Sequence, residues 1–477
     1  MKPGWEMVVG LEVHCELKTD TKLFCGCPNM FGDEPNTNVC PVCLGLPGSL
    51  PVLNQKAVEM AMAIGTALNC EIRPSTFHRK NYFYPDMPKD YQISQYDEPI
   101  NAGGFLDLPD GSRVGIVRAH LEEDTGKTTH AGASGRIHGA DYSLVDYNRS
   151  GVPLVEIVSE PDIRSAAQAR AYSSELRGIL VATGASDGRL EEGSMRFDAN
   201  VSVRPVGASA FGTRCEIKNL NSLRSLGRAI EYEAARQIAL IERGETVSQE
   251  TRHWDEAAGR TQTMRSKEEA NDYRYFPEPD LVPLVPDADW QARVRLSMGP
   301  MPADRRAALV ELVGGSASEA ESDQIRAVVD LGLDGLVVEA VRAGAPARLA
   351  LARAANELAA EGEAGLALPR SAFVTLLEME SKGELSATQS KAVLSAAVAA
   401  VGSDPRELAR ELGFEALGAD TLAAVVDDVV AAHPDEWARY VQGDDKLTGF
   451  FTGSVMKATS GQANGKDVAV ELRRRRG

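Results

Sequence analysis

The chain contains 477 residues, of which 43% are hydrophobic and 25% charged, so it can bury the cores of roughly two to four globular domains. Its formal net charge of −18 argues against a general coat for nucleic acid, because phosphates would be repelled at long range, but it leaves room for a local basic patch. No apolar run approaches the roughly 18 to 20 residues that span a bilayer, and "MKPGWEMVVG" lacks the apolar core of a secretory signal, so we expect a cytoplasmic protein without membrane segments.

Strands and helices are both expected in the first part of the chain. Stretches rich in β-branched residues predict strands over 7–13, 113–121, 153–159 and 195–206. Ser165 and Gly184 delimit one predicted helix, and Ser222 and Gly244 delimit another. Because these elements show no regular βαβ rhythm, we expect an α+β domain with a mainly antiparallel sheet.

The chain changes character near residue 290. The proline-rich "FPEPDLVPLVP" (276–286) predicts an extended connector, because proline removes a backbone donor and disfavours helix in the residue before it. From about Pro302 onward, alanine and leucine recur at helical spacing, and "GSDPRELARELG" (402–413) indicates a further boundary. We therefore expect an α+β domain over 1–293, followed by all-α helical and tail domains over 294–403 and 404–477.

The first motif along the chain is "GLEVHCEL" (10–17). On a strand, Glu12, His14 and Glu16 share one face, and two carboxylates with an imidazole form a platform for a divalent cation. A polar strand face exposed to solvent shows the same alternation, so this motif alone leaves both interpretations open.

Four cysteines follow in "CGCPNMFGDEPNTNVCPVC", namely Cys25, Cys27, Cys40 and Cys43. Two tight pairs joined by a short loop suit a tetrahedral, structural zinc site. Unliganded thiols or a redox pair are the alternatives.

Basic and aromatic residues alternate in "FHRKNYFYPDMPKDYQISQYDEP" (77–99). They are Arg79, Lys80, Tyr82, Phe83, Tyr84, Lys89 and Tyr91. Such a mixture suits stacking and phosphate contact at an RNA end, and it equally suits tyrosines packed at the edge of a core.

The stretch "RAHLEEDTGKTTH" (118–130) resembles the end of a phosphate-binding loop. A true loop of that type has a glycine five positions before its second glycine, and Leu121 stands there instead. The acids after His120 favour a Mg²⁺ site that carries nucleotide phosphates, with Lys127 free to contact a phosphate oxygen.

Further carboxylates lie within apolar strands, at Glu156, Asp198 and Glu216. Acids in such strands are costly unless they are paired or bind metal. The alternative to a metal site is a set of ordinary salt bridges with Arg149, Arg196, Arg204 or Lys218.

Taken together, the motifs are familiar. They are "GLEVHCEL", "FHRKNYFYPDMPKDYQISQYDEPI", "HLEEDTGKTTH", "SLVDYNRSGVPLVEIVSEPDIRS", "EEGSMRFDANVSVRP", "EIKNLNSL", "DYRYFPEPDLVPL" and "GFFTGSVMKATSGQANGK". In this order they closely resemble the B subunits of the aspartyl/glutamyl-tRNA amidotransferases. The resemblance covers almost the whole chain, although residues 300–435 match by helical character more than by motif.

The resemblance implies a function. Such a protein binds mischarged Glu-tRNA(Gln), Asp-tRNA(Asn) or both, and uses ATP with Mg²⁺ to phosphorylate the side-chain carboxylate of the attached amino acid. Ammonia then displaces the phosphate, and it comes through a channel from a separate amidase, the A subunit. The heterotrimer is completed by a small third protein, the C subunit. The sequence does not decide between the two tRNA substrates.

The resemblance also implies roles for single residues. The family's Mg²⁺ ligands match Glu12, His14, Glu123 and Glu156, with Glu122, Asp198 and Glu216 as catalytic companions. Lys127 is expected to contact phosphate, and Lys80, Tyr82 and Lys89 to line the ammonia route or hold the tRNA acceptor end. No catalytic nucleophile is expected, so Cys15, Cys70 and Cys215 are interpreted as packing residues.

The C-terminal part is expected to bind tRNA. Its basic residues are Lys446, Lys457, Lys466 and the terminal run Arg473 to Arg476, although such a run is more often a solvated tail. Two competing functions remain: a non-catalytic zinc-containing RNA-binding module, which has no need of the acids, and a free-standing Mg²⁺-dependent ligase acting on a small acid, which has little use for the helical arm.

Overall fold

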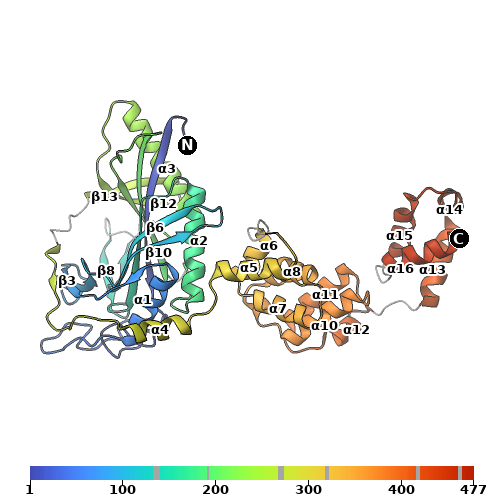
Figure 1. The fold of residues 1–477 in the computed structure, drawn as a ribbon, viewed down its shortest axis with the longest axis horizontal. Helices are drawn as coiled ribbons and strands as arrows, with labels where there is room; N and C mark the ends of the chain where they lie inside the picture. Colours follow the sequence, from blue (N-terminus) through green and yellow to red (C-terminus); the bar gives the residue numbers. More distant parts are fainter. Residues whose placement is uncertain are drawn as a thin grey trace. The chain divides into compact units, whose positions relative to one another are not determined.

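The computed structural model describes residues 1–132, 140–190, 193–266, 273–316, 322–414, 419–459, 463 and 465–476. The chain divides into two compact units, Met1–Met301 and Pro302–Gly477 (Figure 1). Glu191, Glu192, Asp272 and Ser460, which belong to the motifs quoted above, lie outside the described residues.

The first unit is built on one large sheet. Its strands are β1 (Trp5–Glu16), β2 (Glu71–Ile72), β3 (Phe77–Asn81), β4 (Tyr91–Gln95), β5 (Asn101–Asp107), β6 (Arg113–Glu123), β9 (Pro153–Ser159), β10 (Met195–Pro205), β11 (Cys215–Leu220), β12 (Glu250–Asp255), β13 (Arg260–Ser266) and β14 (Phe276–Pro277). They lie in the order β13-β12-β11-β10-β1-β9-β6-β4-β3-β14, with β5 paired to β6 and β2 to β5. Among the described strand pairs only β11 and β12 run parallel, so the predicted α+β class with a mainly antiparallel sheet is confirmed.

The four strands predicted from β-branched stretches form β1, β6, β9 and β10 at the centre of the sheet. Alternate residues such as Leu11, Val13, Leu121 and Ile157 are fully buried on one face. Each such side chain stabilises the fold by roughly 1.5–3 kcal/mol. The residues between them are polar and point to the other face.

Three helices cover the apolar face: α1 (Gln55–Ala67), α2 (Ala166–Ala182) and α3 (Leu223–Glu242), all labelled in Figure 1. The predicted limits of α2 and α3 are confirmed. Ser165 Oγ accepts a hydrogen bond from Gln168 N, and Ser222 Oγ accepts one from Ser225 N, each at 3.0 Å. Both helices are followed by a glycine with positive φ, which a residue with a side chain adopts only with strain.

A small hairpin and a long loop extend this unit. The hairpin pairs β7 (Lys127–Ala131) with β8 (Tyr142–Asp146), and the loop between β1 and α1 carries the four clustered cysteines. The loop is tied to the hairpin because Asn36 N donates to Asp146 Oδ1 at 2.9 Å. The fully buried Lys22 donates to the carbonyl oxygens of Asn38 at 2.8 Å and Tyr147 at 3.2 Å.

The proline-rich connector is extended, as predicted, but it also packs on the first unit. Its start forms β14 on β3, and Arg79 Nε donates to Glu278 at 2.6 Å. The following helix α4 (Ala288–Ser297) packs on α1, where Trp290 Nε1 donates to Glu59 at 3.2 Å. The first unit therefore ends at Met301 and not at the expected residue 293, which lies inside α4.

The second unit is helical throughout its described residues. Its helices are α5 (Pro302–Leu312), α6 (Asp323–Asp330), α7 (Asp334–Arg342), α8 (Ala347–Asn356), a 3₁₀ turn (Leu358–Glu361), α9 (Glu363–Leu366), α10 (Arg370–Ser381), α11 (Ala387–Ala399), α12 (Pro405–Glu411), α13 (Ala419–Ala432), α14 (Pro434–Val441), α15 (Leu447–Ala458) and α16 (Gly465–Arg476).

This unit contains two separate apolar cores, one from Leu309 to Ala409 and one from Leu422 to Leu472. The expected boundary at residue 404 falls directly before α12, but Leu408 and Ala409 of α12 pack in the first core. The "SDP" pattern is the N-cap of α12, where Asp404 accepts from Arg406 N at 2.9 Å, and the break between the cores follows that helix.

Among the described residues, no helix is long and apolar enough to cross a membrane.

Candidate active site

The polar face of the sheet brings together most of the residues singled out above. Strand register places His14 opposite Glu156, and His120 opposite the same glutamate on its other side. It also places Glu12 opposite Asp198. The alternative of a solvent-exposed strand face therefore fails for "GLEVHCEL", because its polar residues face other titratable side chains.

Three of these side chains form what we call the histidine–acid group: His14, Glu122 and Glu156. Each offers a ligand atom within 4.8 Å of the others. His120 Nε2 lies 3.1 Å from Glu156 Oε2 and 3.9 Å from Glu122 Oε2, and Ser94 Oγ donates to Glu122 at 3.3 Å. Burial acts to raise the pKa of Glu156, but the imidazole of His120, assisted by His14 and Lys80, lowers that pKa well below its usual value. Two carboxylates and an imidazole suit a divalent cation such as Mg²⁺ or Mn²⁺.

A second set, the triple-acid group, consists of Glu12, Asp198 and Glu216, again with ligand atoms within 4.8 Å of one another. The ammonium of Lys218 lies 2.8 Å from Asp198 Oδ2 and 3.2 Å from Glu216 Oε1. Asn200 Nδ2 donates to Glu12 Oε1 at 2.8 Å, and Thr251 Oγ1 donates to Glu216 at 3.0 Å. The salt-bridge alternative is thus correct for the contacts of Lys218.

Within the triple-acid group, Glu12 is the member that also senses the charge of Glu156 in the histidine–acid group. Burial raises the pKa of its carboxyl, and so do the nearby carboxylates of Glu156, Glu216 and Asp198. Because carboxylates of both groups raise this pKa, a cation bound at either group would lower it and favour the ionised form of Glu12.

Glu123, expected as a metal ligand, belongs to neither group, so the structure places it apart from the other expected ligands. Because successive residues of a strand point to opposite faces, Glu123 points away from Glu122. It is 2% exposed, accepts a hydrogen bond from Ile93 N at 2.8 Å and forms an ion pair with Lys89. Glu122 is the acid of this pair that reaches the histidine–acid group.

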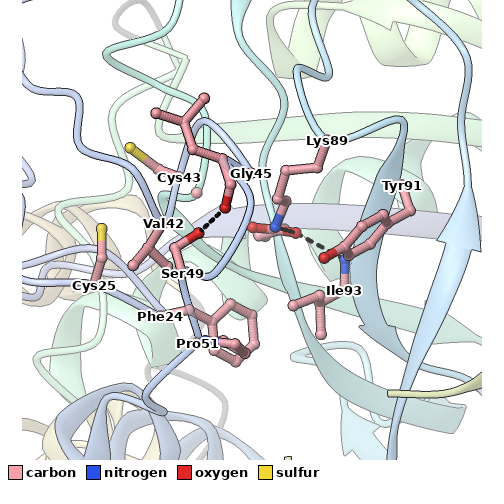
Figure 2. Close-up of a pocket in the computed structure, with 13 residues that line it drawn as sticks. Phe24, Cys25, Val42, Cys43, Gly45, Ser49, Pro51, Lys89, Tyr91 and Ile93 are labelled. Atoms are coloured by element: carbon pink, nitrogen blue, oxygen red, sulfur yellow. Dashed lines mark hydrogen bonds and ion pairs between the residues drawn. The ribbon is translucent and has the colours of Figure 1, made fainter. Parts of the chain in front are cut away.

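The Lys89–Glu123 pair lines a small pocket of about 50 Å³ next to the cysteine loop. Figure 2 shows Lys89, Tyr91 and Ile93 on one side of this pocket, with Phe24, Cys25 and Cys43 on the other. Lys89 Nζ also lies 5.1 Å from the centre of the Tyr91 ring.

Lys127 is also separated from both groups. It is exposed on β7 and lines a larger cavity of about 480 Å³ together with Glu16 and Arg149. No hydrogen bond or ion pair within the described residues joins Lys127 to either group, so its expected phosphate contact has no support in this geometry.

Glu16 shares that cavity and not the cation platform. Burial raises the pKa of its carboxyl to about 8, and the charge of the neighbouring Asp124 adds to the effect. Asp124 itself pairs with Arg196 at 3.0 Å and with Arg149 at 3.6 Å.

Lys80 lies on β3, which pairs with the edge strand β14, and Tyr82 directly follows β3. The charge of Lys80 contributes to the lowered pKa of Glu156, so this lysine lies near the histidine–acid group. Its Nζ is 4.9 Å from the centre of the Tyr273 ring. Tyr82 stacks on Tyr84 at 4.6 Å, which fits the alternative of tyrosines packed at a core edge.

Two functional candidates were missed from the sequence, Arg118 and Tyr275. Arg118 Nε donates to His120 Nδ1 at 3.4 Å; strand alternation with His120 could have indicated it. Tyr275 stacks on Tyr96 at 4.1 Å, and burial raises its pKa with help from Glu122 and Glu156. No local signal places Tyr275 here, because it arrives through the pairing of β14 with β3.

The four clustered cysteines converge. Their Sγ atoms all lie within 4.8 Å of one another, those of Cys40 and Cys43 are 3.9 Å apart, and all four thiols are free of disulfide bonds. A hydrogen bond with Cys25 lowers the pKa of the Cys43 thiol to about 5. This donor set fits a tetrahedral zinc ion. In contrast, the three cysteines expected to be packing residues lie outside this cluster: Cys15 and Cys215 are buried, and Cys70 is half-buried against the apolar core.

Comparison with known proteins finds relatives over nearly the whole chain. A family model described as the GatB/GatE catalytic domain matches residues 7–292, and one described as the GatB domain matches residues 336–475. Proteins named as B subunits of aspartyl/glutamyl-tRNA(Asn/Gln) amidotransferase are similar over nearly their whole length. The protein of Frankia casuarinae is 50% identical, with 97% of this chain and 94% of that protein covered. The protein of Moorella thermoacetica is 49% identical, with 96% and 97% covered.

The two matched regions fall in the two structural units, the first on the sheet that carries both acid groups and the second on the helices. The chain therefore belongs to the family of aspartyl/glutamyl-tRNA(Asn/Gln) amidotransferase B subunits.

Proposed function

We propose that this chain activates the side-chain carboxylate of Glu-tRNA(Gln), Asp-tRNA(Asn) or both by ATP-dependent phosphorylation, and that ammonia then converts the activated group to an amide. As a member of its family, the chain is part of a ligase that forms carbon–nitrogen bonds with glutamine as amido donor. The observation that carries the proposal is the histidine–acid group, built on the central strands of the polar face. A binding module without chemistry has no need of this group.

His14, Glu122 and Glu156 would hold Mg²⁺, with Glu12 beside them. When bound, Mg²⁺ supplies the charge neutralisation that phosphate oxygens require next to carboxylates. His120 holds Glu156 in place by its contact at 3.1 Å, and Arg118 supports His120 from the other ring nitrogen. Lys80 lies close to the same group, and its positive charge can stabilise a bound phosphate.

The proposed chemistry balances without a nucleophile from this chain. A side-chain carboxylate oxygen of the aminoacyl group attacks the γ-phosphorus of ATP, the bond to the bridging oxygen breaks, and ADP leaves. Ammonia then attacks the carbonyl carbon of the resulting acyl phosphate, loses a proton and expels inorganic phosphate. Phosphorylation is needed because a free carboxylate is a poor acyl electrophile.

We place the entry of ammonia at the pocket beside the cysteine loop. The pocket is small, and the buried Lys89–Glu123 pair lies at its wall. On this proposal a separate amidase, the A subunit, supplies the ammonia, and a small third protein, the C subunit, completes the heterotrimer. Zinc on the four thiols holds the loop in shape. The helical second unit binds the tRNA in the cytoplasm.

The test is amide formation by the reconstituted heterotrimer, with each mischarged tRNA, ATP, Mg²⁺ and glutamine. Glu122→Gln is expected to lower ATP-dependent phosphorylation by on the order of 100-fold or more, because it removes one cation ligand, while tRNA binding persists. Glu71→Gln serves as control, since that exposed carboxylate pairs with Arg73 and belongs to neither acid group. Normal phosphorylation by Glu122→Gln contradicts the proposal.

A further inference from the structure

The two acid groups on the polar face differ in one respect: the triple-acid group already contains a cation. Lys218 enters from β11 and places its ammonium 2.8 Å from Asp198 Oδ2 and 3.2 Å from Glu216 Oε1. Both partners are buried, Asp198 being 9% and Glu216 7% exposed. No lysine or arginine forms an ion pair with the histidine–acid group within the described residues, although Lys80 lies near it; the imidazole of His120 contacts Glu156 at 3.1 Å and Glu122 at 3.9 Å.

This difference decides what each group can bind. An imidazole has a lone pair when neutral, so it tolerates or even joins a bound metal ion. An ammonium has three donors and no lone pair, so it competes with a metal for the same carboxylate oxygens. Carboxylates that already satisfy an ammonium would have to release it before they could bind a divalent cation.

The rest of the triple-acid group resembles a cation site apart from this lysine. Asn200 holds Glu12 through its Nδ2, and its Oδ1 is buried without a hydrogen-bond partner within the described residues. Strand register places His253 beside Lys218, and its Nε2 is buried and also lacks a partner there. An unpartnered oxygen atom thus lies on the residue that holds Glu12, and an unpartnered nitrogen atom lies on the strand neighbour of Lys218.

We propose that Lys218 is a built-in cation that fills the triple-acid group and limits the polar face to one divalent cation. The inference rests on the proposed function only in that the histidine–acid group binds that cation. Lys218 is then a positioning residue: it acts through Asp198 and Glu216 and holds a fixed positive charge where a two-metal site would carry its second ion.

Direct cation binding tests this inference. The full chain is titrated with Mn²⁺, and bound and free ions are counted by electron paramagnetic resonance, in the wild type and in Lys218→Met. We expect one tightly bound Mn²⁺ per wild-type chain and two per Lys218→Met chain. Lys218→Arg retains the charge and Lys56→Met removes an exposed lysine on α1, so both are expected to bind one.

The outcomes separate the two proposals. Two Mn²⁺ ions of similar affinity on the wild type, or a single ion on Lys218→Met, overturn the role of Lys218 and leave the proposed function standing. No tightly bound Mn²⁺ on the wild type contradicts the cation site of the proposed function itself. If Lys218→Met does not fold, Lys218→Gln replaces it, because glutamine retains hydrogen-bond donors without the charge. The double variant Glu122→Gln with Lys218→Met is expected to bind one ion, held by the triple-acid group.

Discussion

At the scale of single residues, Glu122 and Glu123 show how strongly one position along a strand changes a carboxylate. Glu122 faces the histidines of the polar face, whereas Glu123 is buried against Lys89 on the other side. The sequence shows both acids in one motif but not which of them faces His14. That choice depends on how β6 pairs with β9, a contact between residues far apart in the chain.

The Lys89–Glu123 pair makes a prediction about ammonia. Replacing both residues, Lys89→Met with Glu123→Gln, removes the pair without leaving a buried charge unpaired, which would itself cost several kcal/mol. We expect glutamine-dependent amidation by the complex to fall by roughly 10-fold or more, while ATP-dependent phosphorylation of the tRNA-bound carboxylate is retained. Equal loss of both activities would place the pair in the phosphorylation site instead.

Glu16 makes a prediction about pH. Its pKa in the folded chain is about 8, above the ordinary value of 4.5, so its contribution to stability is present below pH 4.5 and is lost as the pH rises toward 8. Glu16→Gln cannot ionise. The unfolding free energy of the variant minus that of the wild type should therefore increase by about 1–3 kcal/mol from pH 5 to pH 8.5. Urea denaturation at the two pH values measures the change, and a difference that does not vary with pH refutes it.

At the scale of elements, local patterns were most informative where one face of a strand or helix is buried. The β-branched stretches predicted β1, β6, β9 and β10, and the serine caps and glycine stops predicted α2 and α3, because each signal lies within the element itself. The approach of Tyr275 to the polar face could not be predicted, since it depends on the pairing of β14 with β3. Neither could the packing of α4 on α1.

The cysteine loop is an element whose shape we attribute to zinc. Cys40→Ser with Cys43→Ser should abolish binding of about one zinc ion per chain and destabilise the first unit by roughly 2–5 kcal/mol. Cys70→Ala, a half-buried thiol outside the loop, is the matched control and should retain zinc. Metal analysis and thermal melting measure both effects, and a double variant that retains zinc and stability contradicts the assignment.

At the scale of the whole molecule, the helical unit contains two cores, and the division between them lies after α12. The terminal arginines are not a free tail. Arg475 pairs with Asp427 at 2.7 Å, Arg474 pairs with Glu471 at 2.7 Å, and Arg476 pairs with Asp445. Composition suggested a solvated tail or an RNA patch for this run. The pairs of Arg475 with Asp427 and of Arg476 with Asp445 could not be predicted, because these acids lie on α13 and in the loop before α15, whereas Glu471 lies on α16 itself.

Two truncations test this division. A chain ending at residue 414 retains α12, so its first helical core should have the same melting temperature as that core in the full chain. A chain ending at residue 403 loses the buried Leu408 and should be less stable by about 2 kcal/mol or more. Both lack the second core, so tRNA affinity should fall in both while Mn²⁺ binding by the first unit persists. Equal stability of the two truncated chains would instead support a boundary between the two helical cores at residue 404.

The central claim is that a side-chain carboxylate on tRNA is activated by phosphorylation, and the fate of its oxygen tests this claim directly. Glu-tRNA(Gln) labelled with oxygen-18 in both side-chain carboxylate oxygens is converted by the complete complex with ATP and glutamine. If an acyl phosphate forms, one labelled oxygen leaves with each inorganic phosphate when ammonia attacks, and mass spectrometry of the phosphate will show it. Amide formation accompanied by unlabelled phosphate would contradict the account.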